Sequence, residues 1–274
     1  MRLPSDLTLI RKRYGFTSSN VLTYNNPKTD KTFKAFGIPT AVLHLTPMLH
    51  GVCPAAGTCQ STCLHRSGNQ RYFTVKFARR KLRSDAFHYE PNSFKRLLVL
   101  EIARYISKHP DAKTIAIRLN GTSDVRWEFE LVDIDQHLCL YISKMFGIYV
   151  PVGTYHILNL IRMMGGTCYD YTKRVDRDFD LCRKLGYQLT MSHGSIHNTL
   201  AVAFEHGLNY AAPIDIKRGA ELPVGWVDGD LTDWRPGDPT GMTHVIGLRY
   251  KRAKGATPEQ VKEFCADANI LALA

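Results

Sequence analysis

Strand-like and helix-like runs alternate along most of this chain of 274 residues, and this alternation limits its fold more than any other feature. Short runs rich in β-branched residues indicate strands, and apolar residues at every third or fourth position indicate helices. Strands that alternate with helices pair in parallel through right-handed crossovers. We therefore predict an α/β fold, a partial (β/α) barrel of about six parallel strands with flanking helices. A doubly wound sheet is the alternative.

The predicted elements form one continuous series without a visible linker or repeat. The predicted strands lie at 41–45, 114–119, 167–172, 187–192, 209–215 and 244–250. The predicted helices lie at 92–108, 132–147, 154–164, 175–185 and 196–206. A C-terminal helix begins clearly, with Thr257 as cap, Pro258 at the first position and Gln260 closing a capping box. We expect a single α/β domain over 1–274, with an N-terminal extension (1–20) and this helix within 256–274.

The chain has no features of a membrane or secreted protein. It contains no run of about 18 consecutive apolar residues, so we predict no membrane span. Its first residues, MRLPSDLTLIRKRYG, lack the apolar region and cleavage site of a secretion signal. We expect a cytoplasmic protein.

Three cysteines, Cys53, Cys59 and Cys63, lie within one loop after the first predicted strand, spaced C-x5-C-x3-C. We call residues 50–69 the cysteine loop. In a reducing compartment, clustered thiols are more often metal ligands than disulfides. Three cysteines without a clear fourth ligand suit a [4Fe–4S] cluster with one open iron. Zinc is an alternative, with His65 as fourth ligand, and free thiols without a metal are another.

Polar and charged residues follow the later predicted strands. In parallel α/β folds the functional site lies at the carboxyl ends of the strands, so these residues should converge there. They are Asn120, Gly121, Thr122, Asp124, Lys173, Ser192 and Asp215. We take Asp124, Lys173 and Asp215 as the candidate catalytic groups, because carboxylates and amines can transfer protons.

The net charge is +11, from 36 Lys and Arg against 25 Asp and Glu. A charge of this size favours anionic partners, with nucleic acid or a nucleotide as the first candidates. Two basic runs, 77–83 and 249–254, interleave aromatic residues with cations, which suits stacking combined with phosphate contact. A basic surface without a specific partner is the alternative.

Two further patterns have ordinary structural interpretations. Four acidic residues lie within 228–239, and we interpret them as turn residues in preference to a divalent metal site. His193 and His197 are four residues apart without the H-E-x-x-H pattern of a zinc helix, so we interpret them as exposed residues at a helix start.

Several motifs together resemble a known family. They are NNPKTDKTFKAFGIPTAVLHLTP, GVCPAAGTCQSTCLHRSGN, IRLNGTSDVRWE, CYDYTKR, YQLTMSHGS, PVGWVDGDLTDWRPGDP and VIGLRYKRAKG. In this order they resemble the phage-encoded gene product 88-like family over roughly residues 20–255. The order also resembles that of a radical S-adenosylmethionine (SAM) partial barrel, although the cysteine spacing of that superfamily is C-x3-C-x2-C.

The resemblance implies a cofactor and a chemistry. The three loop cysteines would hold a [4Fe–4S] cluster whose open iron binds SAM, and an electron donor of the host would drive its reductive cleavage. Asn120, Gly121 and Thr122 would meet the SAM amino group, and Lys173 and Ser192 would face its ribose or carboxylate. The implied protein is a radical-SAM-like enzyme acting on nucleic acid or nucleotides in the host cytoplasm. The alternative is a zinc-stapled, basic nucleic-acid-binding protein without catalysis.

Overall fold

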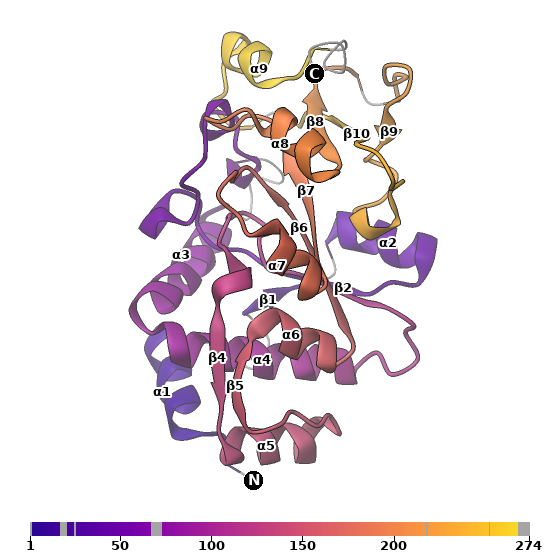
Figure 1. The fold of residues 1–274 in the computed structure, drawn as a ribbon. Coiled ribbons are helices and arrows are strands. Elements are labelled where there is room, and N and C mark those ends of the chain that lie inside the picture. The colour runs from indigo at the N-terminus through magenta and orange to yellow at the C-terminus, as the bar shows by residue number, and fades with distance from the viewer. Residues whose placement is uncertain are drawn as a thin grey trace.

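The computed structural model describes residues 2–16, 21–24, 26–66, 73–217, 219–251 and 253–267. Parts of the predicted segments lie outside this range: 67–69 of the cysteine loop, 1 and 17–20 of the N-terminal extension, 252 of the basic run at 249–254, and 268–274 at the C-terminus. The described chain forms an eight-stranded, mostly parallel sheet flanked by helices, together with a separate pair of strands (Figure 1). The prediction of an α/β fold with flanking helices is therefore confirmed.

The eight-stranded sheet has the order β1-β2-β3-β6-β7-β8-β10-β9. Its strands are β1 (Leu22–Thr23), β2 (Thr40–Leu43), β3 (Ile115–Arg118), β6 (Gly166–Thr172), β7 (Tyr187–Ser192), β8 (Tyr210–Ile214), β9 (Val227–Asp228) and β10 (Val245–Arg249). Only β1 pairs antiparallel with its neighbour; every other pair is parallel.

Six strands, from β2 through β3, β6, β7 and β8 to β10, follow one another across the sheet in chain order. The order does not reverse among these six strands, whereas a doubly wound sheet requires a reversal. The two-residue strand β9 lies beyond β10, at the edge of the sheet. The described strands also do not close on themselves, because β1 and β9 form two separate edges. The carboxyl ends of all six strands therefore meet along a single edge.

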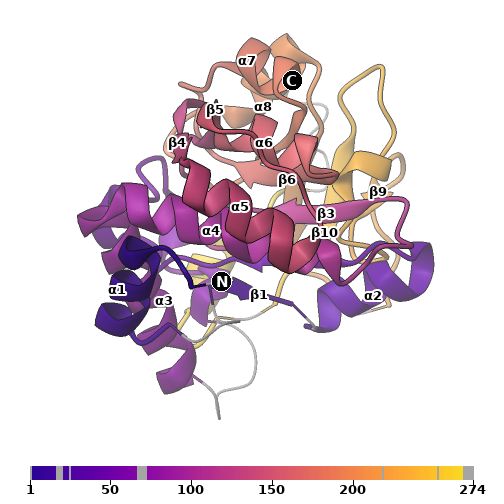
Figure 2. The ribbon, with the colours of Figure 1, turned by 90° about the horizontal axis from the view of Figure 1, so that it is seen from below.

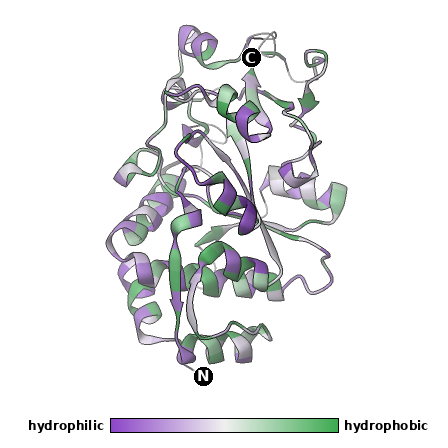
Figure 3. Ribbon diagram, viewed as in Figure 1, coloured by the Kyte–Doolittle hydropathy of each residue, from purple (hydrophilic) through white to green (hydrophobic). Residues whose placement is uncertain are grey.

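One face of the sheet is covered by most of the helices. They are α1 (Ser5–Tyr14), α3 (Phe73–Tyr89), α4 (Pro91–Ser107), α5 (Gln136–Phe146), α6 (Ile157–Met163), α7 (Phe179–Lys184) and α8 (Thr199–His206). The main hydrophobic core joins their apolar residues to alternate strand residues such as Ile115 and Ile117. Figure 2 shows α5 lying across α4, and Figure 3 shows many hydrophobic residues on α4 and α6.

The opposite face carries the other alternate residues, including Ala116 and Tyr169, which pack with Ile38 and Trp234. Helix α2 (Pro27–Phe36) lies on this side, away from α4 and α5 (Figure 2). Arg118 also projects from this face, where it pairs with Asp233. The two faces differ as the period of two in a strand requires.

Two predicted helices begin later than expected, because their first residues form strands. Strands β4 (Leu131–Ile134) and β5 (Gly153–His156) pair antiparallel as a separate sheet. The helix predicted at 132–147 is therefore wrong over its first turn, and so is the one predicted at 154–164. In β4 exposed and buried residues alternate, a strand pattern too short to stand out before the longer helical pattern. Asp135 then caps α5 by accepting from the backbone N–H of Leu138.

The helix ends follow ordinary capping rules. Asp178 and Asn198 cap α7 and α8, so both helices begin after the predicted starts at 175 and 196. Helix α9 (Pro258–Phe264) has the predicted Thr257 cap and the predicted capping box with Gln260. Over the described ranges, none of the helices combines the length and the apolar character needed to cross a membrane.

Candidate functional site

The cysteine loop follows β2 and crosses the edge where the parallel strands end. Within 50–66 it forms three short 3-10 turns, Leu49–Gly51, Thr58–Gln60 and Leu64–Arg66, and no longer element. Met48 and His50 enter it with φ of 63° and 54°, a left-handed conformation that costs free energy for residues other than glycine. Such strain persists only where surrounding contacts fix the backbone.

Backbone contacts dock the loop on the residues that follow β7. The N–H groups of Gly57 and Cys59 both donate to the Gly194 carbonyl, at 3.0 and 3.3 Å. Ala56 forms an antiparallel bridge with Ser195, and the Ser195 hydroxyl donates to the Ala55 carbonyl. A Cβ at Gly194 would lie 3.2 Å from Cβ of Cys59 and 2.6 Å from the ring of Phe264 in α9. Glycine therefore lets both the loop and α9 pack closely against this turn.

The same loop is joined to the residues that follow β3. The backbone N–H of Asp124 donates to the Val52 carbonyl at 2.7 Å. The thiol of Cys53 donates to the Thr122 carbonyl at 3.8 Å. The predicted convergence of the cysteine loop with the polar residues after β3 and β7 is therefore present at this edge.

Cys53, Cys59 and Cys63 are all free thiols of intermediate exposure. Burial raises the pKa of Cys53 to about 12, and burial is also the main cause of the raised pKa of Cys63. Cys63 raises the pKa of Cys53, and Cys59 raises that of Cys63, so the three thiols influence one another. Among the described residues, no group of three or more His, Cys, Asp or Glu side chains is already arranged to hold a metal ion.

Two cations flank the thiols. Arg80 reaches the loop from α3 and is only 8% exposed, and burial lowers its pKa to about 10. Lys173 follows β6 and donates to the Ser192 hydroxyl at 2.9 Å. Both cations lower the pKa of Cys63. Neither forms an ion pair with any acidic residue that the structure describes.

The histidines nearest the thiols are engaged elsewhere. Nδ1 of His65 lies 2.6 Å from the guanidinium of Arg80, and the ring stacks on Phe77 at 4.2 Å. Because a guanidinium only donates, Nδ1 accepts and the neutral ring carries its proton on Nε2. Burial, followed by the charge of Arg80, lowers the pKa of His65 to about 4, so the ring is neutral. Neither ring nitrogen then offers a free lone pair.

His44 lies at the end of β2 in a strongly positive environment. Burial lowers its pKa well below the ordinary value, and the charges of Arg80, Arg83, Arg118 and Lys76 lower it further. Several positively charged side chains therefore lie near the end of β2.

The side chain of Asn120 is used within the protein. Its amide nitrogen donates to the Val125 carbonyl and the Tyr187 hydroxyl. Its oxygen accepts from the backbone N–H of Val125, from Ser123 and from the indole of Trp127. Asn120 is thus a scaffold for the turn after β3.

The next two residues of this turn fit closely against β2. A Cβ at Gly121 would lie 2.4 Å from Cγ1 of Val42, so only glycine fits. The Thr122 hydroxyl donates to the Leu45 carbonyl at 2.6 Å. These contacts hold the turn in place and occupy the side-chain groups that the sequence suggested for a cofactor.

Asp124 is the acceptor in a buried network. Its carboxylate accepts from Arg177 at 2.6 Å, from the Thr172 hydroxyl at 2.8 Å and from the backbone N–H of Lys173 at 2.7 Å. Arg177 also pairs with Glu128, and the side chains of both residues are fully buried. Asp124 therefore links the turn after β3 to the residues that follow β6.

Asp215 is the predicted site residue that lies apart from the thiol group. It follows β8 and is exposed, and no contact within the described part of the chain joins it to the cysteine loop. It lies near Cys265, whose pKa is raised to about 11 by burial and then by the charge of Asp215. Its convergence with Asp124 and Lys173 is not seen.

A family model described as Gene product 88 matches residues 18–268, which is most of the chain. The chain belongs to the phage gene product 88 family. No curated protein and no solved structure gives a significant match. The predicted resemblance to this family is confirmed.

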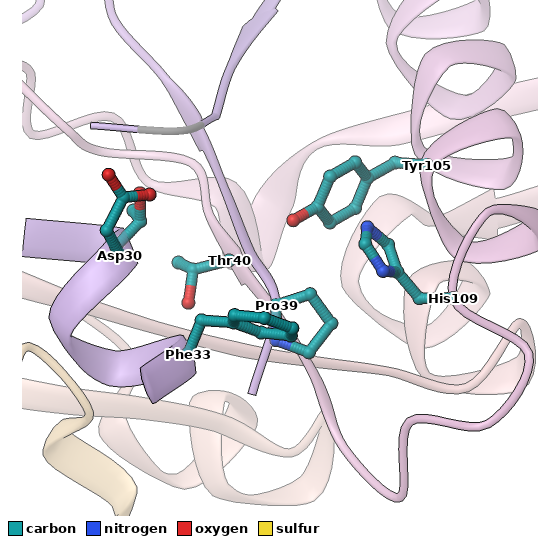
Figure 4. Close-up of a pocket in the computed structure, with 7 residues that line it drawn as sticks. Asp30, Phe33, Pro39, Thr40, Tyr105 and His109 are labelled. Atoms are coloured by element: carbon teal, nitrogen blue, oxygen red, sulfur yellow. The ribbon is translucent and has the colours of Figure 1, made fainter. Parts of the chain in front are cut away.

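The gene product 88 chain also has a small cavity away from the cysteine loop. Its volume is about 80 Å³, room for a few water molecules and far below the roughly 300 Å³ of a typical small-molecule site. Figure 4 shows the cavity beside Thr40, at the start of β2. The thiols follow the other end of this strand. The other lining residues are Thr29, Asp30, Phe33, Pro39, Tyr105 and His109.

The acidic run at 228–239 pairs with arginines in this family member. Asp228 contacts Arg249 at 2.9 Å, and Asp238 contacts Arg235 at 3.1 Å. The run ends in a short 3-10 turn, Arg235–Gly237, as the turn interpretation expected. Its carboxylates thus neutralise arginines within the fold.

His193 differs from the prediction of an exposed residue, whereas His197 is exposed. Nδ1 of His193 lies 2.8 Å from the Tyr210 hydroxyl, and the ring lies near Phe264 of α9. Sequence reasoning missed this contact and the role of Arg80, although Arg80 lies within the basic run at 77–83 that we noted. The sequence shows the basic run, but it does not show which arginine of the run is buried.

Proposed function

We propose that this gene product 88 family member is an iron–sulfur protein in which Cys53, Cys59 and Cys63 hold a [4Fe–4S] cluster. The cluster would lie at the carboxyl edge of a partial (β/α) barrel, as in a radical-SAM-like enzyme. The observation that carries the proposal is the pair of cations, Arg80 and Lys173, that flank the thiols without an acidic partner in the described structure.

The charge balance supports this proposal. A buried cation without a counter-charge is strongly destabilising, and Arg80 is almost completely buried. Three neutral thiols leave that charge uncompensated, whereas three thiolates bound to iron provide negative charge beside it. The raised pKa values of Cys53 and Cys63 describe the metal-free state, in which burial disfavours the thiolates. Metal binding reverses that preference, because a metal deprotonates the thiols that bind it.

The donor set fits iron–sulfur better than zinc. A structural zinc site is normally closed by four ligands, and the natural fourth ligand here is His65. That histidine accepts from Arg80 through Nδ1 and carries its proton on Nε2. Three thiols without a fourth ligand instead suit a cluster that keeps one iron open.

An open-site cluster, when bound, supplies one-electron reduction and a position for a small ligand. The residues of this chain that remain available near the thiols are Lys173 and Ser192, which contact each other at 2.9 Å. An ammonium group that donates to a hydroxyl can turn towards a carboxylate or a ribose oxygen, as SAM binding would need. Asn120 and Thr122 would act indirectly, by fixing the turn that carries the Cys53 contact.

Anaerobic purification and metal analysis test the proposal directly. We expect about four irons and four sulfides per chain, with visible absorption that dithionite bleaches. Replacing Cys53, Cys59 or Cys63 with Ala should remove most of the iron. Cys265→Ala is the matched control, because Cys265 is also a thiol of intermediate exposure. One zinc per chain without iron, or full iron content in the three loop variants, would overturn the assignment.

SAM binding is measured separately, by equilibrium dialysis with the iron-loaded protein. We expect Lys173→Met to weaken SAM binding at least about tenfold, since a charge-assisted contact is lost. The same variant should keep its iron, because Lys173 is not a ligand. An iron-loaded protein that does not bind SAM would leave the cluster in place and remove the radical-SAM-like part of the proposal.

A further inference from the structure

A row of cations lies on one face of α3, beside the cysteine loop. Lys76, Arg79, Arg80 and Arg83 are spaced i, i+3, i+4 and i+7, so they share one side of the helix. Arg80 and Arg83 are buried at the inner end of this face, whereas Arg79 is exposed. Their charges act on one another: Arg80 lowers the pKa of Lys76, and Arg80 and Arg79 lower that of Arg83. Like charges at this spacing destabilise a helix.

Two more cations belong to segments that lie next to this helix. Arg66 is exposed at the end of the last 3-10 turn of the cysteine loop. The backbone N–H of Lys254 donates to the Arg66 carbonyl at 3.1 Å, which places the 253–256 segment beside that turn. We call Arg66, Lys76, Arg79 and Lys254 the basic face.

Three cations of the basic face lie without counter-charges in the described part of the chain. Arg66, Arg79 and Lys254 form no ion pair with any acidic residue in the described ranges. Some exposed cations elsewhere do have acidic partners: Arg13 pairs with Glu90, and Arg183 pairs with Asp180. Repulsion that the fold retains without internal compensation indicates an external anion.

We propose that the basic face binds the phosphate backbone of single-stranded nucleic acid. One row of cations matches one phosphate backbone, since neighbouring side chains on a helix face are about 5–6 Å apart. A flexible single strand can follow the row inward to the recessed Arg80, whereas a stiff duplex cannot bend into the loop. Much of α3 is hydrophilic (Figure 3), as a phosphate-binding surface requires. The bound strand would pass directly beside the three thiols.

This inference does not depend on the proposed cluster, because the basic face contains none of the thiols. It adds a substrate class to the proposed function: chemistry at the cysteine loop would act on a strand held by α3. Binding can be measured on metal-free and iron-loaded protein alike, so failure of the one proposal is distinguishable from failure of the other.

The test uses the full chain and a fluorescein-labelled oligothymidylate of about 16 nucleotides, a length typical of one single-strand site. Fluorescence anisotropy is measured over a series of salt concentrations. Four phosphate contacts predict a slope of log K against log salt of about −3, because single strands contribute roughly −0.7 per contact. The triple variant Arg66→Glu, Arg79→Glu, Lys254→Glu should bind at least about a hundredfold more weakly and show a much shallower slope.

The matched control changes the net charge by the same amount at exposed lysines away from the basic face, as Lys34→Glu, Lys113→Glu, Lys144→Glu. It should keep most of the affinity, and the circular dichroism and thermal unfolding of both triple variants should match wild type. An equal loss in the control would assign binding to net charge alone and overturn the proposal. Equally tight binding to a duplex of the same length, or to heparin, would overturn the single-strand assignment, as would a lack of binding.

Discussion

Arg80 and His65 are joined by a 2.6 Å contact between the guanidinium and Nδ1, and this contact connects α3 to the cysteine loop. Arg80 belongs to α3, which precedes β3 in the chain, and His65 lies two residues after Cys63. The pair thereby places a buried positive charge next to a thiol while it removes a histidine from the set of metal ligands. This one interaction thus favours a site of anionic thiolates and disfavours a zinc site with His65 as its fourth ligand.

Replacing Arg80 with Gln should make a bound cluster harder to reduce. Removal of a nearby buried cation destabilises the more negative, reduced state, by tens of millivolts at an effective dielectric constant of about 20. Redox titration of the iron-loaded protein measures the midpoint potential. Arg80→Lys should restore most of the shift, and the exposed neighbour change Arg79→Gln should cause little. An unchanged potential in Arg80→Gln would mean that the guanidinium does not face the cluster.

Asp124→Asn should destabilise the fold more than it affects any chemistry. The change leaves Arg177, which is fully buried, without part of its counter-charge, a loss of about 3 kcal/mol in the free energy of unfolding. Asp176→Asn is the control, because Asp176 pairs with Arg174 at an exposed position and should cost less than about 1 kcal/mol. Urea denaturation measures both. If Asp124→Asn were as stable as wild type, the Asp124 carboxylate would not be needed for stability and would be available for catalysis.

The positions of the site residues could be predicted from the sequence, because they depend on topology. Parallel strands in chain order place the residues that follow each strand at one edge, so the cysteine loop, Asp124, Lys173 and Ser192 converge as expected. Asp215 also follows a strand, but it lies near Cys265 instead. Following a strand fixes the edge at which a residue lies but not its place along that edge.

The partners of those residues could not be predicted in the same way. Arg177 lies 53 residues after Asp124, and nothing local indicates that they pair. The oxygen of Asn120 accepts from the indole of Trp127 only because the chain turns back after β3. The basic run at 77–83 is visible in the sequence, but its burial pattern depends on how α3 packs. Such contacts are properties of docked loops and helices, which periodicity does not describe.

His193 should make the fold sensitive to acid. Burial, followed by the charge of Lys173, lowers its pKa to about 4, so the ring is neutral when folded and gains a proton more readily when unfolded. Its contribution to stability is complete above its unfolded pKa of about 6.5 and is lost as the pH falls towards 4. Between about pH 7 and pH 5 the loss is about 2 kcal/mol.

The variant His193→Gln cannot gain a proton, so its free energy of unfolding should fall less than that of wild type over this pH interval. Urea denaturation of both proteins at the two pH values gives the difference. His197→Gln is the control, because His197 is exposed and should leave the pH dependence of wild type in place. Parallel pH curves for wild type and His193→Gln would contradict the assignment of the acid sensitivity to this ring.

Gly194→Ala should separate α9 from the cysteine loop. The residue has φ of +83°, and a Cβ would lie 2.6 Å from the Phe264 ring and 3.2 Å from Cβ of Cys59. Gly207→Ala provides a matched control, since Gly207 has φ of +61° with no atom within 4 Å of the added Cβ. Both changes carry the backbone cost of a left-handed alanine, about 1 kcal/mol. Only Gly194→Ala adds overpacking, about 1–3 kcal/mol more.

The position of that overpacking decides the functional consequence. Gly194 accepts from both Gly57 and Cys59, so a shift of this turn also moves the middle of the cysteine loop. We expect faster labelling of Cys59 by a thiol reagent in metal-free Gly194→Ala, and a lower iron content after loading, with neither effect in Gly207→Ala. Equal labelling rates in the two variants would show that α9 and the turn after β7 do not hold the loop in place. The cysteine arrangement would then depend on the contacts with β3 alone.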